Sequence, residues 1–444
     1  MDEMLSDQVV VLPIYNGTYF NALFKTASKL QELTNYRFIF FFGQEYPGRG
    51  KHEEVLKGRF KYISHHDSWI CKSAKLRFVR LIRKFPLIDE VVSFLETLAR
   101  VVNLNFLLRK IWKMNNIRLF ILPADNRYFY PFIVKFCKQR SCPVIVMPQW
   151  FAGHLELEQS FAHSKIYKPG ALRRRIIRLI SEKYLRPASF QTLEFQMIPI
   201  RFSEILLRWL YKVKSPDPWI LHSGESDRIF VETKETFEFA KKLGFGENQL
   251  VLTGSVYLDE MNLYVSEPEN QIELLVAVAP DMFASRHHAN LEFANYKDYL
   301  IFLCESLLHS GYSEATFSMH PSDAGNWTNL VSAFGFSITE KPLHLILPRS
   351  KVFLATVSST IQWAVYLKVP TVNFDFYRYN YPDYSNLGDV VYVQGKNDLV
   401  PALYSASQIN SLKRGQNSPK EKFVDESKEP SINTILAEIN ILVR

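Results

Sequence analysis

The sequence predicts an α/β protein of two doubly wound domains that face a cleft, and three observations support this prediction. The chain has 444 residues, more than one compact domain usually contains. Continuously apolar segments, typical of strands buried on both faces, alternate with segments of helical periodicity. The alternation occurs in both halves of the chain, so each half is expected to form a Rossmann-like parallel sheet covered by helices.

The first half begins with a strand, a helix and a second strand. Val9–Pro13 and Arg37–Gly43 are the strand candidates, and the apolar residues of Phe20–Leu33 recur at helical spacing. The same order of elements recurs at 117–147. The pattern of 51–112, between these units, is mostly helical and basic, so we expect a helical insertion in this domain.

The alternation of strand and helix patterns begins again at residue 219. Strands are predicted at 219–224, 227–233, 249–255, 273–280, 315–321, 336–340, 351–357 and 369–375. Helices are predicted at 234–243, 293–310, 323–333 and 359–367. We therefore expect one domain at 1–220, a second at 221–405 and a polar tail with a short helix at 406–444. The fold of 151–220 is left open.

The charge is distributed unevenly along the chain. The formal net charge is +8, and the segments 72–84 and 171–185 combine clustered basic residues with an apolar stripe at helical spacing. Such helices are typical of an anionic membrane surface, although an amphipathic helix that faces a protein core has the same stripe. No helix-turn-helix, zinc-finger or RNP pattern is present, so we predict no nucleic-acid partner.

The N-terminus and the cysteines predict a cytoplasmic protein, and the basic segments 72–84 and 171–185 predict that it is peripheral at the inner face of the cytoplasmic membrane. The four cysteines are scattered without CxxC or metal-ligand spacing, which argues against a disulfide framework and a structural zinc site. The first residues are acidic where a signal peptide needs basic ones. No uninterrupted apolar run reaches the roughly 18–20 residues that a spanning helix requires.

Polar residues follow two predicted strands of the second half. His320 ends one of these strands, and Ser358, Ser359 and Thr360 open the helix after another. Hydroxyls at a helix N-terminus and an imidazole are donors that suit a phosphate. Each feature alone is typical of a helix cap or a turn. Their occurrence in consecutive strand-end loops predicts one anion site.

Two further loops carry candidates for chemistry. Asp125 follows a strand of the first half and is either a helix N-cap or a general base that takes a proton from an attacking hydroxyl. Arg286 lies in the loop after 273–280, where it either holds an anion or forms part of a solvated loop. The residues expected on the acceptor side are Asn16, Gly17, Asn126 and Arg127.

Several common enzyme signatures are absent from the chain. The sequence has no GxGxxG fingerprint, no P-loop and no GxSxG element. Their absence argues against a nicotinamide enzyme, a P-loop ATPase and an α/β-hydrolase. No DxD-type pair follows a predicted strand. We therefore expect chemistry that needs neither a metal ion nor a cofactor.

Four segments resemble GT-B glycosyltransferases, non-hydrolysing UDP-GlcNAc 2-epimerases and the Kdo-, sialyl- and CDP-glycerol-type transferases of surface polysaccharides. Residues 227–261 resemble the start of the nucleotide domain and include Thr253 and Gly254. SMHPSD at 318–323 is similar to the His-Pro element, and 355–375 to the Ser-rich turn that holds donor phosphates. Residues 121–150 resemble the loop in which these families carry an acidic residue.

The resemblance implies a bacterial, metal-independent glycosyltransferase that makes capsule or lipopolysaccharide. A CMP-, CDP- or UDP-linked sugar would be bound by His320, Ser358, Ser359, Thr360, Arg286, Thr253 and Gly254. Asp125 would act as the base, and the acceptor would be a membrane-associated glycan or glycolipid. Val357–Thr360 stands where the epimerases have Asp-Ser-Gly-Gly, and Ala124 replaces the Gly before the acid, which argues against epimerase activity. The alternatives are an epimerase, a glycerophosphotransferase and a non-catalytic membrane-associated binding module.

Overall fold

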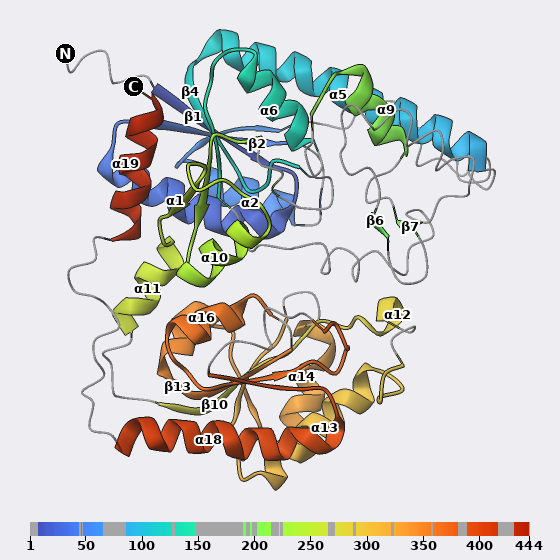
Figure 1. The fold of residues 1–444 in the computed structure, drawn as a ribbon, viewed down its shortest axis with the longest axis vertical. Helices are drawn as coiled ribbons and strands as arrows, with labels where there is room; N and C mark the ends of the chain where they lie inside the picture. The colour runs from blue at the N-terminus through green and yellow to red at the C-terminus, as the bar shows by residue number, and fades with distance from the viewer. Residues whose placement is uncertain are drawn as a thin grey trace. The chain divides into compact units, whose positions relative to one another are not determined.

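The chain folds into two compact units (Figure 1). The computed structural model describes residues 8–43, 46, 48–64, 86–126, 129–147, 190–191, 196–197, 202–214, 222, 225–264, 271–286, 290–320, 324–356, 358–380, 389–415 and 430–443. One unit comprises Met1–Val256 and Ser431–Arg444, and the other comprises Tyr257–Pro430. Each unit contains a parallel sheet with helices on both faces, as the sequence predicts.

The first unit contains a seven-stranded parallel sheet with the strand order β3-β2-β1-β4-β5-β8-β9. The strands are β1 (Gln8–Ile14), β2 (Arg37–Phe42), β3 (Lys61–Ser64), β4 (Asn116–Leu122), β5 (Val144–Val146), β8 (Arg228–Val231) and β9 (Leu250–Leu252). A separate antiparallel pair is formed by β6 (Phe190–Gln191) and β7 (Gln196–Met197).

Helices cover both faces of the first sheet because successive side chains of its strands point to opposite faces. Val9 and Val11 pack with α5 (Pro86–Met114), α6 (Tyr130–Lys138), α9 (Phe202–Leu210) and α10 (Lys234–Lys242). Val10 and Leu12 pack with α1 (Phe20–Leu33), α2 (Arg49–Leu56) and α19 (Ser431–Val443). The continuous apolar strands of the sequence therefore correspond to a sheet that is buried on both sides.

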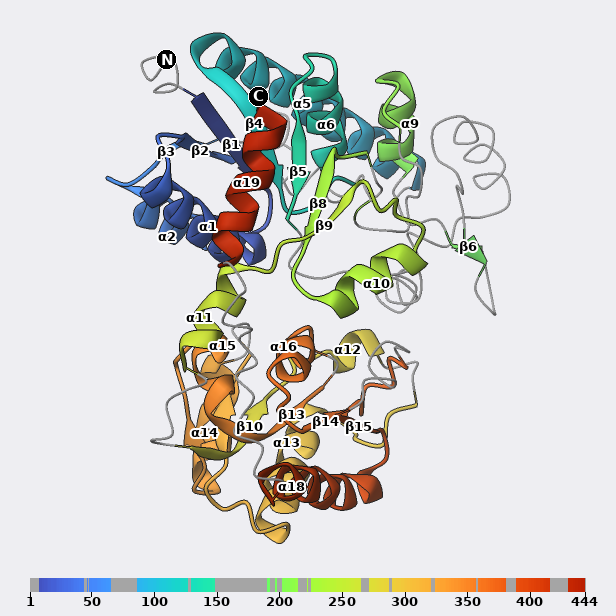
Figure 2. The ribbon, with the colours of Figure 1, turned by 60° about the vertical axis from the view of Figure 1, so that its left-hand side comes forward.

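The last helix of the chain belongs to the first unit. Figure 2 shows α19 beside α1, and Ile435 and Ile439 of α19 are fully buried in the core of that face. Gly254, at φ +71°, allows the chain to pass close to the start of α19, because a Cβ there would lie 2.3 Å from Ser431 Oγ.

The second unit contains a six-stranded parallel sheet with the order β12-β11-β10-β13-β14-β15. The strands are β10 (Ile272–Ala277), β11 (Thr316–Ser318), β12 (Ser337–Ile338), β13 (Ser350–Ala355), β14 (Thr371–Phe374) and β15 (Val390–Val393). The helices are α11 (Val256–Tyr264), which begins at the junction of the units, α12 (Phe283–Arg286), α13 (Tyr296–His309), α14 (Ala324–Ala333), α15 (Leu343–Ile346), α16 (Thr360–Tyr366) and α18 (Leu399–Gly415).

The predicted domain boundaries are wrong. We expected the second domain to begin at 221, but β8 pairs with β5 through Ile145 and Arg228, and β9 pairs with β8. The first sheet therefore includes both strands, and the boundary lies at Val256. The predicted polar tail is also wrong in part, because α18 extends through 406–415 and packs on the second sheet with Leu403 fully buried.

The structure adds two features to the predicted helical insertion. The stretch 51–112 contains a strand, β3, in addition to its helices. A helix long and apolar enough to cross a membrane, by length and composition alone, is present at Val91–Met114 within α5, with a mean hydropathy of 1.5. The basic segments 72–84 and 171–185 lie outside the described residues, as do Arg127 and most of 151–220.

Candidate functional site

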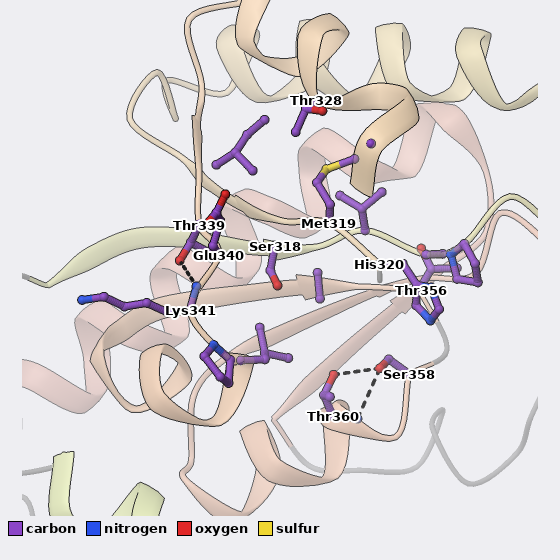
Figure 3. A pocket seen from close by; sticks show the side chains of 18 of the residues that line it. Ser318, Met319, His320, Thr328, Thr339, Glu340, Lys341, Thr356, Ser358 and Thr360 are labelled. Carbon is purple, nitrogen blue, oxygen red and sulfur yellow. Dashed lines mark hydrogen bonds between the residues drawn. The ribbon is translucent and has the colours of Figure 1, made fainter. Parts of the chain in front are cut away.

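The second unit contains a cavity of about 970 Å³ at the carboxyl ends of its central strands (Figure 3). In a parallel sheet these ends share one edge, which is where α/β proteins usually bind ligands. The cavity is lined by residues that follow β10, β11, β12 and β13 and by α14, among them Ala279, Pro280, Ser318, Met319, His320, Thr328, Thr339, Glu340, Lys341, Thr356, Ser358 and Thr360.

His320 lies at the cavity, two residues after the end of β11. Ser318, Met319 and His320 all line the cavity, and of the last two Met319 is buried and His320 is exposed. The backbone at this point is fixed by a hydrogen bond of 3.0 Å from the Val278 amide to the Ser318 carbonyl. His320 and the hydroxyls of Ser358 and Thr360 therefore line the same cavity, at the place predicted from the sequence.

The Ser-rich turn after β13 presents two hydroxyls in a fixed arrangement. Ser358 Oγ lies 2.8 Å from Thr360 Oγ1 and accepts a hydrogen bond of 3.3 Å from the Thr360 amide. Figure 3 shows both side chains at the cavity wall below His320. Ser359 is exposed, is not among the cavity-lining residues and does not cap α16 with its side chain.

The end of a third strand, β12, contributes a wall of the cavity that was not predicted from the sequence. Thr339, Glu340 and Lys341 follow β12 and line the cavity, and the Lys341 amide donates to Thr339 Oγ1 over 3.1 Å. Glu340 and Lys341 are both exposed, so one rim carries an anion and a cation. Their position directly after the predicted strand 336–340 is the signal that would have found them.

The cavity can bind a ligand of nucleotide size. Its volume lies at the upper end of the range for small-molecule sites. His320, Ser358 and Thr360 supply hydrogen-bond donors that suit phosphate oxygens. Among the residues that the structure describes, no cluster of three His, Cys, Asp or Glu side chains with metal-binding geometry is found.

Two of the predicted donor-binding residues belong to the first unit. Thr253 and Gly254 follow β9, and Thr253 Oγ1 donates to the Gly254 carbonyl over 3.0 Å. Neither lines the cavity of the second unit, so assigning them to the nucleotide domain is wrong. The turn instead accommodates the start of α19. Arg286 ends α12, but its side chain lies outside what the structure describes.

Asp125 lies in the interior of the first unit. Its side chain is 1% exposed, and Oδ2 accepts a hydrogen bond of 3.1 Å from the Ser226 amide. The bond connects the end of β4 to the start of β8. A carboxylate in this position cannot reach an acceptor hydroxyl unless the loop rearranges, so its burial opposes the role of general base.

Asn126 is held inward by a buried arginine. Arg208, from α9, is 0% exposed and donates to Asn126 Oδ1 over 2.9 Å and to the Asn126 carbonyl over 3.0 Å. It also pairs with Glu204 Oε1 at 2.6 Å. The network satisfies a buried charge and fixes the loop after β4, which is a structural role.

Asn16 and Gly17 follow β1, and Gly17 lies against Tyr46 and against His52 of α2. A Cβ at Gly17 would be 2.9 Å from Tyr46 Cε2 and 3.1 Å from His52 Cε1. The His52 ring stacks on Phe20 with centroids 4.1 Å apart, and its Nδ1 lies 2.9 Å from the Tyr46 hydroxyl. Burial lowers the pKa of His52, which keeps the ring neutral at pH 7. Within the described ranges, Nε2 has no hydrogen-bond partner.

Comparisons with known proteins identify the fold. A scan of protein-family models and a search of curated proteins find no match. Solved structures match over nearly the whole chain. A glycosyltransferase of kitacinnamycin is 10% identical, with 98% of this chain and 99% of that one covered and a TM-score of 0.55.

Two plant structures give the same result. A UDP-glucosyltransferase from Polygonum tinctorium that glucosylates indoxyl is 10% identical, with 98% of both chains covered and a TM-score of 0.55. A UGT transferase from Siraitia grosvenorii in complex with UDP is 13% identical, with 98% and 100% covered and a TM-score of 0.51. The chain therefore has the two-domain GT-B fold of glycosyltransferases, which confirms the fold class predicted from its motifs.

Proposed function

We propose that the protein is a glycosyltransferase that takes a sugar from a nucleotide-activated donor. The observation that carries the proposal is the convergence of His320, Ser358 and Thr360 in one cavity at the carboxyl edge of the second sheet. Similar structures include transferases in complex with UDP or with a UDP-linked fluoroglucose. The nucleotide of the donor, whether CMP, CDP or UDP, would occupy this cavity.

The cavity residues would act on the leaving group. During transfer the bond between the anomeric carbon and the phosphate oxygen breaks, and its electron pair leaves with the nucleotide. A new bond forms between that carbon and the acceptor oxygen. Donors from His320, Ser358 and Thr360 directed at the departing phosphate stabilise the charge that develops there, which lowers the barrier without a metal ion.

The acceptor hydroxyl must lose its proton to a base. Asp125 is the residue that the motifs indicate, but its burial favours His52 for this role. His52 is neutral at pH 7 and lies beside the predicted acceptor loop at Asn16 and Gly17. Its Nε2 is a proton acceptor if the Tyr46 hydroxyl accepts a hydrogen bond from Nδ1.

The acceptor and the biological setting follow from the motif resemblance. The Ser-rich turn and the His-Pro element are similar to those of surface-polysaccharide transferases, so we propose a membrane-associated glycan or glycolipid acceptor. Capsule or lipopolysaccharide synthesis in a bacterium, at the inner face of the membrane, is the corresponding setting. Both inverting and retaining transfer fit this arrangement.

Mass spectrometry of the reaction products tests the proposal. The protein is incubated with CMP-, CDP- and UDP-linked donors and a glycan acceptor mixture, and the acceptor is expected to gain the mass of one sugar. A donor that keeps its mass but changes its chromatographic retention would indicate an epimerase, and addition of a phosphorus-containing unit to the acceptor would indicate a glycerophosphotransferase. If no nucleotide binds, the proposal is wrong.

A further inference from the structure

Helix α5 has two apolar faces, of which the first sheet buries only one. Val101, Leu104, Leu108 and Ile111 are buried in the core of that sheet. A second set of apolar side chains, 49% to 65% exposed, consists of Val91, Leu95, Val102 and Phe106. At 3.6 residues per turn these four fall within an arc of about 60° on the side away from the sheet. Only 17% of the apolar window of the helix is buried.

The apolar stripe ends in a group of cations. Arg109 and Lys113 continue the same arc toward the C-terminus of α5, and Lys110 lies next to them. All three are exposed. Between residues 91 and 114 the helix carries four basic residues and a single acid, Glu96. The exposed face of α5 is therefore apolar along most of its length and positive at one end.

A groove between α5 and α6 extends this face. It has a volume of about 500 Å³ and an apolar lining that includes Phe106, Phe132 and Phe136, with Arg109 and Lys135 as its cations. The groove can accept an acyl chain whose anionic headgroup lies against the cations.

The end of α9 also presents exposed apolar and basic side chains. Figure 1 and Figure 2 show α9 packed along α5, and Tyr211, directly after α9, lines the groove. Trp209 and Leu210 are exposed, and two exposed cations, Lys212 and Lys214, follow them. Tryptophan beside lysine is typical of the interface between a bilayer and water.

We infer that the outer face of α5, together with the end of α9, docks on an anionic phospholipid bilayer. The helix lies along the membrane surface and does not cross it, because a spanning position would remove Val101, Leu104 and Leu108 from the core of the sheet. The positive end of the stripe favours an anionic bilayer, because the headgroups attract these cations along the same surface that buries the apolar side chains. The inference is independent of the proposed transfer reaction.

Co-sedimentation of the full chain with vesicles tests this surface. The probes are vesicles of phosphatidylcholine and phosphatidylglycerol in equal parts and vesicles of phosphatidylcholine alone. Wild-type protein is expected to sediment with the anionic vesicles and to be released by high salt. Replacing Arg109, Lys110 and Lys113 by Gln should weaken binding roughly a hundred-fold, at about five-fold per cation.

A variant with negative charges introduced into the apolar stripe tests the surface most directly. Leu95→Glu with Phe106→Glu is expected to abolish binding, whereas Leu33→Glu on α1, 51% exposed on the opposite face of the sheet, should not affect it. Circular dichroism shows whether each variant folds. Equal binding by the two variants, or no binding by the wild type, overturns the inference. So does sedimentation velocity that shows a lipid-free dimer lost in the Leu95→Glu, Phe106→Glu variant.

Discussion

The carboxyl edges of the two sheets differ, although both sheets are parallel, are covered by helices on both faces and consist of similarly apolar strands. In the second unit the strand ends open into a cavity that His320, Ser358 and Thr360 line. In the first unit, Asp125 and Asn126 lie in the loop after β4 and accept hydrogen bonds from Ser226 and Arg208. A polar residue at a strand end therefore lines a cavity in one unit and is part of the internal structure in the other.

The second unit also contains a polar residue that follows a strand and has a structural role. Asp375 follows β14 and is fully buried, and its carboxylate accepts hydrogen bonds from the Tyr379 and Asn380 amides, the Tyr392 hydroxyl and Gln394 Nε2. It fixes the loop beside the cavity without lining it. Burial with satisfied partners, and not the position at a strand end, distinguishes the two kinds of residue.

The largest expected effect tests the structural side of this comparison. Arg208→Ala leaves Glu204 and Asn126 without their cationic partner inside the first unit. Breaking a buried charge network in this way is expected to lower the free energy of unfolding by about 3–5 kcal/mol. Urea denaturation followed by circular dichroism measures it. A loss below about 1 kcal/mol would show that the network is not structural.

The next effect tests the ligand side. His320→Ala is expected to reduce turnover about a hundred- to a thousand-fold, because it removes a donor to the departing phosphate. The exposed position of His320 implies an unchanged urea midpoint. Steady-state kinetics with the donor identified by mass spectrometry measures the change. Wild-type turnover in this variant would remove the phosphate-site assignment.

A matched pair of serines sharpens the comparison within one turn. Ser358→Ala removes a hydroxyl that lines the cavity, and Ser359→Ala removes a neighbouring hydroxyl that does not. One neutral hydrogen bond to the ligand is expected to contribute about 0.5–1.5 kcal/mol, so Ser358→Ala should weaken nucleotide binding up to about ten-fold. Isothermal titration calorimetry measures both variants. Equal losses in the two variants would contradict the geometry.

The smallest expected effect concerns how the reaction rate depends on pH through His52 of the first unit. The pKa of His52 is lowered from 6.5 by burial, so the ring stays neutral until the pH falls below that value. If His52 is the base, the acid limb of the pH–rate profile lies below pH 6.5, and His52→Gln abolishes this limb. The free energy of unfolding is also expected to fall as the pH falls through this range. The reason is that His52 binds a proton more readily in the unfolded state than in the folded state. An acid limb that persists in His52→Gln would exclude the residue.

Much of the fold could be predicted from the sequence, but not the assignment of strands to sheets. The apolar runs at β1, β2, β10 and β13 and the helices between them lie where their periodicity indicates. The pattern of β8 is typical of any buried parallel strand, and nothing local specifies that it pairs with β5. The domain boundary was misplaced for this reason.

The candidate site could be predicted only where it is local. Ser358 and Thr360 are two residues apart. His320 follows β11, which only β10 separates from β13 in the sheet, so the three residues lie at the same edge of the parallel sheet. The burial of Asp125 depends on Ser226, 101 residues away, and that of Asn126 on Arg208, 82 residues away. Such long-range contacts leave no periodicity in the sequence.

A structure of the protein in complex with CDP or UDP tests the central claim most directly. The cavity of the second unit is predicted to hold the nucleotide, with a phosphate oxygen within hydrogen-bond distance of His320 and of the Ser358 hydroxyl. A nucleotide bound elsewhere on the chain, or phosphates directed away from His320, would contradict the account.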